Sequence, residues 1–246
     1  MPIRNVLVLD KKDSPWFNFL GQFLEDTPSQ LEIAFDAPSA TTLLERTNPS
    51  MLFLNPELAS PALKQKIKVN RLGAPEMRVF RVGPAKAAAA DDFVWCDHFE
   101  MPENLVQFQK KISGHLVLPE EIRVLVVDDE FEIGAMIRDY LQGRAKPSFV
   151  VRHTDDGRKG LEILEKGECD VLILDVKMPI MDGRDVYRRI AEKKIKIPAI
   201  LFFDSVSGDE WMDIRKIGRP AVVEKGGRES AMPEMMALIK KMVYFG

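Results

Sequence analysis

Carboxylates follow two runs of apolar residues in the second half of the chain. Asp175 comes directly after residues 171–174, and Asp128 and Asp129 come directly after residues 124–127. A continuous apolar run of this length predicts a strand buried on both faces, as in a parallel sheet. Ligands bind beyond the carboxyl ends of such strands, so two neighbouring strands would bring the three acids to one edge.

Carboxylates held this close raise one another's pKa and repel. A divalent cation relieves that repulsion, and carboxylate oxygens suit Mg²⁺. A metal ion beside a nucleophilic carboxylate is the apparatus for accepting a phosphoryl group, because the ion neutralises charge on the transferring oxygens. Lys225 follows the short apolar run of residues 221–223. At the same edge of the sheet, its ammonium group would suit an ion pair with a phosphorylated Asp175.

In order and spacing, residues 122–246 resemble the receiver domain of two-component response regulators, the CheY-like family. The residues that carry the resemblance are Asp128-Asp129, Asp156-Gly157, the run Leu174-Asp175-Val176-Lys177-Met178-Pro179, Asp182-Gly183, Ile197-Pro198, Gly218 and Lys225. The resemblance implies a five-stranded parallel sheet with five flanking helices. It also implies that Asp175 accepts a phosphoryl group from a sensor histidine kinase or phosphotransfer protein. Mg²⁺ would be bound by Asp128, Asp129, Asp175 and the backbone carbonyl of Lys177, and Lys225 would contact the phosphate.

Three positions depart from the pattern of that family. Receivers usually carry Thr or Ser at the end of the fourth strand, where this chain has Phe203. Ser205 lies on the same strand face if the strand continues, and it is the candidate for the missing hydroxyl contact. Val222 stands where an aromatic switch residue is usual, and Gly226 stands where a Pro is usual. Phosphoryl acceptance therefore remains the expectation, while the usual hydroxyl-and-aromatic switch is in question.

The first half of the chain also alternates between predicted strands and predicted helices. Strands are expected at residues 3–9, 31–35, 51–54, 77–82 and 93–95, with a short helix at 85–90 and a closing helix at 102–113. This alternation predicts a second doubly wound parallel sheet. The expected fold class is α/β, with two tandem five-stranded parallel sheets of the flavodoxin-like, CheY-like kind.

When the two halves are compared as repeats, the first looks like a degenerate receiver. Asn55 stands over Asp175, and an amide cannot form an acyl phosphate. The acidic pair is reduced to Asp10, with Lys11 beside it. This holds whether residues 6–10 are aligned with residues 125–129 or with the residues one position earlier. Near the expected lysine, residues 95–97 contain no Lys. Residues 101–103 repeat the Met-Pro-Glu sequence of residues 232–234, and we aligned the two.

Length and composition indicate two ordinary globular domains. The chain has 246 residues, of which 46% are hydrophobic and 30% charged. We predict a pseudo-receiver at residues 1–116, a linker at 117–121 and a receiver at 122–246. The net charge of −3 is divided as −2 in residues 1–120 and −1 in residues 121–246, so neither half is a basic module and nucleic acid is not favoured as a direct partner.

The sequence carries no sign of a membrane segment or of cysteine chemistry. No apolar run reaches the roughly 18 residues of a membrane span, and the N-terminus lacks the layout of a signal peptide. A cytoplasmic location is therefore expected. Cys96 and Cys169 have no metal-ligand spacing, and a disulfide between them is not expected in that location.

Three hypotheses for function follow from these residues. The leading one is a stand-alone, non-enzymatic response regulator that is phosphorylated on Asp175 and signals through contacts with a downstream protein or as a homodimer. The second is a structural adaptor built from two receiver scaffolds that are not phosphorylated, which the residues Phe203, Val222 and Gly226 favour. The third, a haloacid-type phosphatase, needs an Asp two residues after the nucleophile, where this chain has Lys177.

Overall fold

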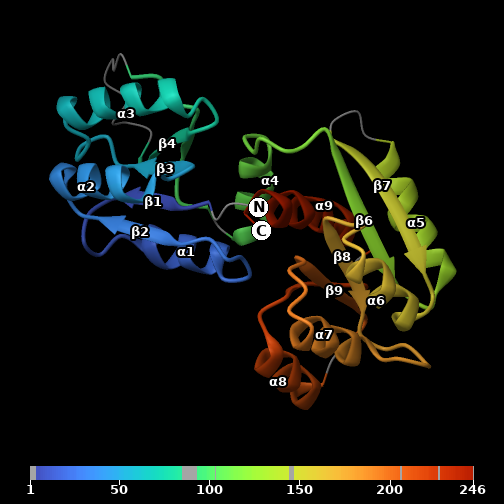
Figure 1. Cartoon of the computed structure of the whole chain (residues 1–246). Coiled ribbons are helices and arrows are strands. Elements are labelled where there is room, and N and C mark those ends of the chain that lie inside the picture. The colour runs from blue at the N-terminus through green and yellow to red at the C-terminus, as the bar shows by residue number, and fades with distance from the viewer. Residues whose placement is uncertain are drawn as a thin grey trace. The chain divides into compact units, whose positions relative to one another are not determined.

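The chain divides into two compact units (Figure 1). The computed structural model describes residues 4–84, 93–102, 104–143, 147–205, 207–226 and 228–245. Unit 1 comprises Met1–Val117, and unit 2 comprises Leu118–Tyr244. The first strand of unit 2 begins at Glu121, within the segment predicted as a linker.

Unit 1 contains one five-stranded sheet and four helices among its described residues. The strands are β1 (Val6–Leu9), β2 (Leu31–Ala34), β3 (Met51–Leu54), β4 (Arg78–Val82) and β5 (Asp97–Phe99); the helices are α1 (Pro15–Leu24), α2 (Ala37–Thr47), α3 (Pro61–Gly73) and α4 (Leu105–Ser113). All strand pairs are parallel, in the order β2-β1-β3-β4-β5. Helices α1, α2 and α3 begin at side-chain caps from Ser14, Asp36 and Ser60, each with a Pro in the first turn.

Unit 2 contains a second five-stranded sheet, with five helices in its described part. The strands are β6 (Glu121–Val127), β7 (Ser148–Thr154), β8 (Val171–Asp175), β9 (Ala199–Phe203) and β10 (Ala221–Glu224); the helices are α5 (Phe131–Gln142), α6 (Gly157–Glu165), α7 (Gly183–Glu192), α8 (Gly208–Ile217) and α9 (Arg228–Phe245). The strands are again all parallel, in the order β10-β9-β8-β6-β7. Taken in chain order within each unit, both sheets have the strand order 2-1-3-4-5 of the flavodoxin-like fold. The predicted fold class is confirmed.

The core of unit 2 lies on both faces of its sheet, as the apolar runs predict. All five residues of β8 are buried. One face packs against apolar side chains of α5 and α9, and the other against those of α6, α7 and α8. A central strand covered on both sides is held rigidly, so the residue at its carboxyl end has a fixed position.

The prediction for the fifth strand of unit 1 is wrong. The strand is Asp97–Phe99, paired with β4, and not residues 93–95. Phe93 instead packs into the core with its ring edge-on to Trp95, while Val94 accepts a hydrogen bond from the Arg71 guanidinium. Aromatic residues favour strands, but here they fill space beside the sheet. The helix expected at 85–90 lies outside the described residues, and the closing helix begins at Leu105.

No helix in the described part of the chain combines the length and the apolar character needed to cross a bilayer.

Candidate functional site

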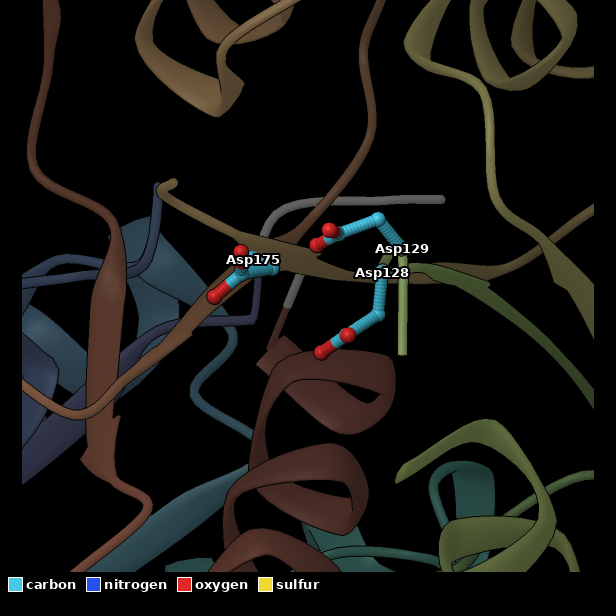
Figure 2. Close-up of side chains that lie close together, drawn as sticks. All are labelled: Asp128, Asp129 and Asp175. Carbon is cyan, nitrogen blue, oxygen red and sulfur yellow. The ribbon is translucent and has the colours of Figure 1, made fainter. Parts of the chain in front are cut away.

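The three predicted acids meet at the carboxyl edge of the unit 2 sheet. Asp175 is the last residue of β8, and Asp128 and Asp129 follow β6, which lies beside β8 with Val127 opposite Leu174. One carboxylate oxygen of each acid lies within 4.8 Å of the others. Figure 2 shows the three side chains turned toward a common space. Asp128 and Asp175 are buried, and Asp129 is exposed.

Lys225 lies in the same site and forms ion pairs with two of the acids. Its Nζ is 2.9 Å from Asp175 Oδ1 and 3.0 Å from Asp128 Oδ2, and the side chain is only 6% exposed. Its backbone N–H donates to the Phe203 carbonyl at 2.7 Å, which fixes the residue just beyond β10. Glu130 Oε1 lies 3.6 Å from the same Nζ, so Glu130 is a further acid near Lys225 besides the three aspartates. Its position beyond the strand end did not predict this contact.

The donor set around Asp128 fits a bound cation. Its Oδ1 accepts the backbone N–H of Glu130 at 2.9 Å. Its Oδ2 is buried and lies 3.0 Å from the Lys225 ammonium. The three aspartates and Lys225 together carry a charge of −2. A divalent ion would neutralise that charge, and the carboxylate oxygens form the oxygen-only ligand set that suits Mg²⁺.

Burial changes the proton affinity of the buried groups. Burial raises the pKa of Asp175 from 3.8 to about 6, against the opposing effect of Lys225 and with a further increase from the Asp128 charge. Burial also raises the pKa of Asp128. For Lys225, burial lowers the pKa, but hydrogen bonds and ion pairs to Asp175 and Asp128 outweigh it, so its pKa is raised. Lys225 is therefore charged whenever the acids are ionised.

These shifts predict a pH dependence of stability without divalent ions. A raised pKa means that the folded protein binds the Asp175 proton more tightly than the unfolded chain does. The free energy of unfolding should therefore fall as pH rises through the interval from about 4 to 6. Urea denaturation in EDTA at several pH values measures this, and Asp175→Asn should show a shallower fall. Equal slopes in the two proteins would contradict the shift.

Gly183 explains why an Asp-Gly pair follows β8. The Asp182 side chain caps α7 by accepting the Arg184 N–H, and the Gly183 N–H donates to the Val176 carbonyl. A Cβ atom on Gly183 would lie 2.0 Å from the backbone oxygen of Asp175. Any side chain here would therefore push on the backbone of Asp175 itself.

We expect Gly183→Ala to lower the free energy of unfolding by about 2–4 kcal/mol, because rigid backbone has to move. Displacement of Asp175 should also weaken Mg²⁺ binding, measured by titration calorimetry. Gly208→Ala is the matched control, since Gly208 also opens a helix after a capping residue and has open space around its Cβ position. Equal losses in the two variants would show that close approach to Asp175 is not the cause.

The structure does not bring Ser205 onto the face that would support its predicted role. Strand β9 ends at Phe203, so the condition for a shared strand face is not met, and Ser205 is exposed. The hydroxyl contact stays a prediction without structural support. The backbone N–H of Lys177 donates to Asp175 Oδ2 at 3.0 Å, whereas the metal-ligand role of its carbonyl stays a prediction.

His153 is a neighbour of the site, although its place in the sequence is typical of an ordinary solvent or core histidine. Its Nε2 lies 2.8 Å from the backbone oxygen of Asp128, and its ring fills the space where a Cβ of Gly134 would lie. This contact helps to fix the turn after β6. A half-buried polar residue on β7 does not by itself indicate a role at the site. The contact between His153 and Asp128 is visible only in the folded structure.

Strand register identifies the residues of unit 1 that occupy the equivalent positions. Leu9 pairs with Leu54 in unit 1, as Val127 pairs with Leu174 in unit 2. Asp10 therefore corresponds to Asp128. Of the two alignments given above, this is the one in which residues 6–10 stand one residue earlier, over 124–128. Lys11 then corresponds to Asp129, and Asn55 to Asp175.

The equivalent of Lys225 is Met101, which corrects the alignment of residues 101–103 with 232–234. Arg81 pairs with Leu54 and His98, as Leu201 pairs with Leu174 and Val222. Three residues further along each fifth strand are Met101 and Lys225. The shared Met-Pro-Glu letters therefore do not mark equivalent positions, because the fifth strand of unit 1 lies at Asp97–Phe99, later in the chain than residues 93–95.

In unit 1 the equivalent site is a network closed by hydrogen bonds. Asp10 Oδ1 accepts the Asn55 amide at 2.7 Å and the backbone N–H of Lys11 at 2.8 Å. Asp10 Oδ2 accepts the Ser14 hydroxyl at 2.6 Å. The Lys11 ammonium pairs with Glu57 at 2.9 Å. Both oxygens of the one retained acid are satisfied by the protein, so nothing in this arrangement calls for a cation.

Comparison with known proteins agrees with the geometry of unit 2. Residues 124–237 match the family described as response regulator receiver domain. The transcriptional regulatory protein QseB of Escherichia coli O157:H7 is 36% identical over 97 residues, which cover 39% of this chain and 43% of that protein. A protein-glutamate methylesterase/protein-glutamine glutaminase of Methanococcus maripaludis is 29% identical over 123 residues, 42% of this chain and 33% of that protein.

Among solved structures, the response regulator domain of Thermotoga maritima CheB is 21% identical with a TM-score of 0.44, covering 50% of this chain and 96% of that one. The chain spans less than half the length of the two curated relatives above, so the activities in their names are not carried over. The family match rests on the second half of the sequence, where the acid cluster and Lys225 lie. Residues 124–237 are a response regulator receiver domain.

Proposed function

We propose that unit 2 is phosphorylated on Asp175 and that the chain acts as a response regulator of a two-component phosphorelay. The observation that carries this is the position of the Asp175 carboxylate, at a rigid strand end between the Lys225 ammonium and the paired acids Asp128 and Asp129. A nucleophilic oxygen, a cation for the phosphate and a divalent-ion site are thereby held together.

Each residue has a chemical role in this proposal. An Asp175 carboxylate oxygen attacks phosphorus, so that an oxygen–phosphorus bond forms as the phosphorus–nitrogen bond of a phosphohistidine donor breaks. Lys225 shifts its ion pair from the carboxylate to a phosphoryl oxygen. Asp128, Asp129, Asp175 and the Lys177 carbonyl would hold Mg²⁺. When bound, the ion neutralises charge on the transferring oxygens.

The donor would be a sensor histidine kinase or a phosphotransfer protein, acting in the cytoplasm. Asp175 is 5% exposed, so the donor must present its phosphoryl group at the open side of the acid cluster. That side lies at Asp129, which is exposed and also lines a surface cavity of about 530 Å³ together with Phe131 and Arg152. Phosphorylation adds about two negative charges, which supplies the change that a downstream protein or a second copy of the chain would read.

Unit 1 is proposed to be a degenerate receiver that serves as a binding surface. Three of its four equivalent positions have lost the reactive group, because they hold Lys11, Asn55 and Met101. The remaining acid, Asp10, is saturated by protein donors. The chain would therefore carry one phosphoacceptor, and we propose no enzymatic turnover of an external substrate by either unit.

Mass spectrometry after incubation with acetyl phosphate and MgCl₂ tests this proposal. We expect the intact protein to gain the mass of one phosphoryl group, in a product that hydroxylamine removes, as expected for an acyl phosphate. Peptide mapping should place the modification at Asp175, and EDTA should prevent it. Absence of any gain with both acetyl phosphate and a purified kinase would overturn the proposal.

A purely structural adaptor is the second candidate, and the fourth strand favours it. Phe203 stands at the strand end where receivers usually place a hydroxyl, and its own carbonyl is occupied by the Lys225 N–H. Titration with beryllofluoride and Mg²⁺ separates the two candidates. Tight binding that Asp175→Asn abolishes supports phosphorylation, whereas binding that is absent in both proteins supports the adaptor.

A further inference from the structure

Unit 1 contains a largely buried cation, two of whose nitrogen atoms have no partner among the residues that the structure describes. Arg81, on β4, is only 9% exposed. Its Nε and Nη2 atoms are buried and make no hydrogen bond in the described segments of the chain. A guanidinium is always charged in a protein, and a buried charge without a partner costs several kcal/mol. Such a group is stable only if something supplies an anion.

Arg81 lies near the edge of the sheet beyond which doubly wound folds bind ligands. It is the second-last residue of β4 and pairs with Leu54 of β3 and His98 of β5, close to the carboxyl ends of the strands. Crevices beyond these ends are the usual ligand sites of doubly wound sheets. Strand alternation places Arg81 on the same face as Val79, which belongs to an apolar cluster with Leu54 and others.

The fold itself does not require an arginine at this position. The equivalent residue in unit 2 is Leu201, which is buried in an apolar cluster with Ile214 of α8. A leucine therefore packs well at the equivalent position of a sheet with the same topology. An arginine here costs stability in the free protein, so its presence needs another explanation.

Nearby described acids are committed to other donors. Asp10 accepts from Asn55, Ser14 and the Lys11 backbone. Asp97 accepts from the His98 backbone N–H and lies within ion-pair distance of His115 and Lys111. Glu57 pairs with Lys11. Each of these carboxylates is therefore already occupied by a donor other than Arg81.

We propose that unit 1 binds a small oxyanion, a carboxylate or a phosphate group, through the guanidinium of Arg81. The fork of N–H donors matches two oxygens of either group. The equivalent of the metal site keeps one aspartate, Asp10, and its Lys11 is paired with Glu57, so this edge carries less negative charge than the three aspartates and Lys225 of unit 2. Unit 1 would then have exchanged the cation site of a receiver for an anion site, and it would respond to a ligand in place of phosphorylation.

Thermal unfolding of the full chain tests this binding. The Trp211→Phe background leaves Trp16 and Trp95 as the tryptophans, so fluorescence follows unit 1. In EDTA, sodium phosphate or sodium acetate is raised to about 20 mM against sodium chloride of equal ionic strength. We expect one of the two anions to raise the melting temperature by about 5 °C, saturably. A larger response to phosphate identifies a phosphoryl ligand, and a larger response to acetate identifies a carboxylate.

Arg81→Met should weaken the anion's binding at least about tenfold, because the bidentate donor is lost. In chloride the same variant should melt no lower than its parent, since a methionine removes an unpaired buried charge. Arg81→Lys keeps the charge without the fork and should bind at intermediate strength. Arg78→Met is the matched control on the same strand, because the Arg78 guanidinium already donates to the His115 and Pro75 carbonyls, and it should keep the full response.

Three results would overturn the proposal. They are an anion response that survives in Arg81→Met, the lack of a response to either anion in the parent, and a lower melting temperature of Arg81→Met in chloride. The last would mean that the protein itself supplies the partner. Asp91 and Asp92, which lie outside the described residues, would then be the acids to substitute with Asn in search of the same loss.

Discussion

Asp175→Asn should reduce phosphorylation by acetyl phosphate or by a kinase to background. The amide cannot form an acyl phosphate, and it removes one carboxylate from the three that would hold Mg²⁺. The fold should survive, because Asn has the shape of Asp and the ionised Asp175 is disfavoured by burial, as its raised pKa shows. Intact mass and a urea melt, measured on the same sample, separate loss of chemistry from loss of fold.

The reverse change in unit 1 provides the matched control. Asn55→Asp places a carboxylate at the equivalent strand end, but its neighbours remain Lys11 and Met101 where unit 2 has Asp129 and Lys225. We expect the double variant Asp175→Asn, Asn55→Asp to stay unphosphorylated. A phosphoryl gain in Asp175→Asn alone would remove Asp175 as the acceptor. A gain only in the double variant would show that unit 1 lacks nothing but the carboxylate.

Lys225→Met should cause the largest loss of stability of the substitutions considered. It removes the ammonium that lies 2.9 Å from Asp175 and 3.0 Å from Asp128, and it leaves two buried carboxylates facing each other. Breaking a buried ion pair in this way costs about 3–5 kcal/mol. Urea denaturation at pH 7 in EDTA measures the loss. Phosphorylation should also slow, because the cation that meets the phosphoryl oxygens is gone.

Magnesium should restore much of this stability if the acids form its site. A divalent ion that binds only the folded protein raises the free energy of unfolding, and it should do so more in Lys225→Met than in the wild type, where the ammonium competes for the same oxygens. Lys216→Met is the control, because Lys216 is exposed and pairs only at the surface with Asp213. Equal effects of MgCl₂ on both variants would count against a cation site at Asp128, Asp129 and Asp175.

The acids and the lysine of the unit 2 site could be predicted from the sequence because each stands at the end of a buried apolar run. An apolar run places its last residue at a sheet edge, and two such runs in a parallel sheet place their acids at the same edge. Lys225 followed from the same reasoning. The spacing of residues along the chain therefore predicted the candidate site, and the structure supplied its distances, the ion pairs of Lys225 with Asp128 and Asp175, and the contact with Glu130.

The sequence was least informative where local preference and tertiary packing disagree. Residues 93–95 have strand-forming side chains, yet they fill space beside the core, and β5 lies at Asp97–Phe99. That shift concealed the equivalence of Met101 and Lys225, which depends on pairing between distant strands. Ser205 was placed by assuming that β9 continues, and the strand stops at Phe203.

By itself, the sequence determined the doubly wound fold of both halves, the acids and lysine of the second half, and the amide of Asn55 at the position equivalent to Asp175, because these depend on residue type and on alternation along the chain. Only the tertiary structure decided the strand register, the closed network around Asp10 and the Arg81 Nε and Nη2 atoms that lack a partner in the described part of the chain. Those features depend on which residues of different strands lie opposite one another, and on whether a buried polar atom finds a partner there. Neither can be read from a linear order of residues.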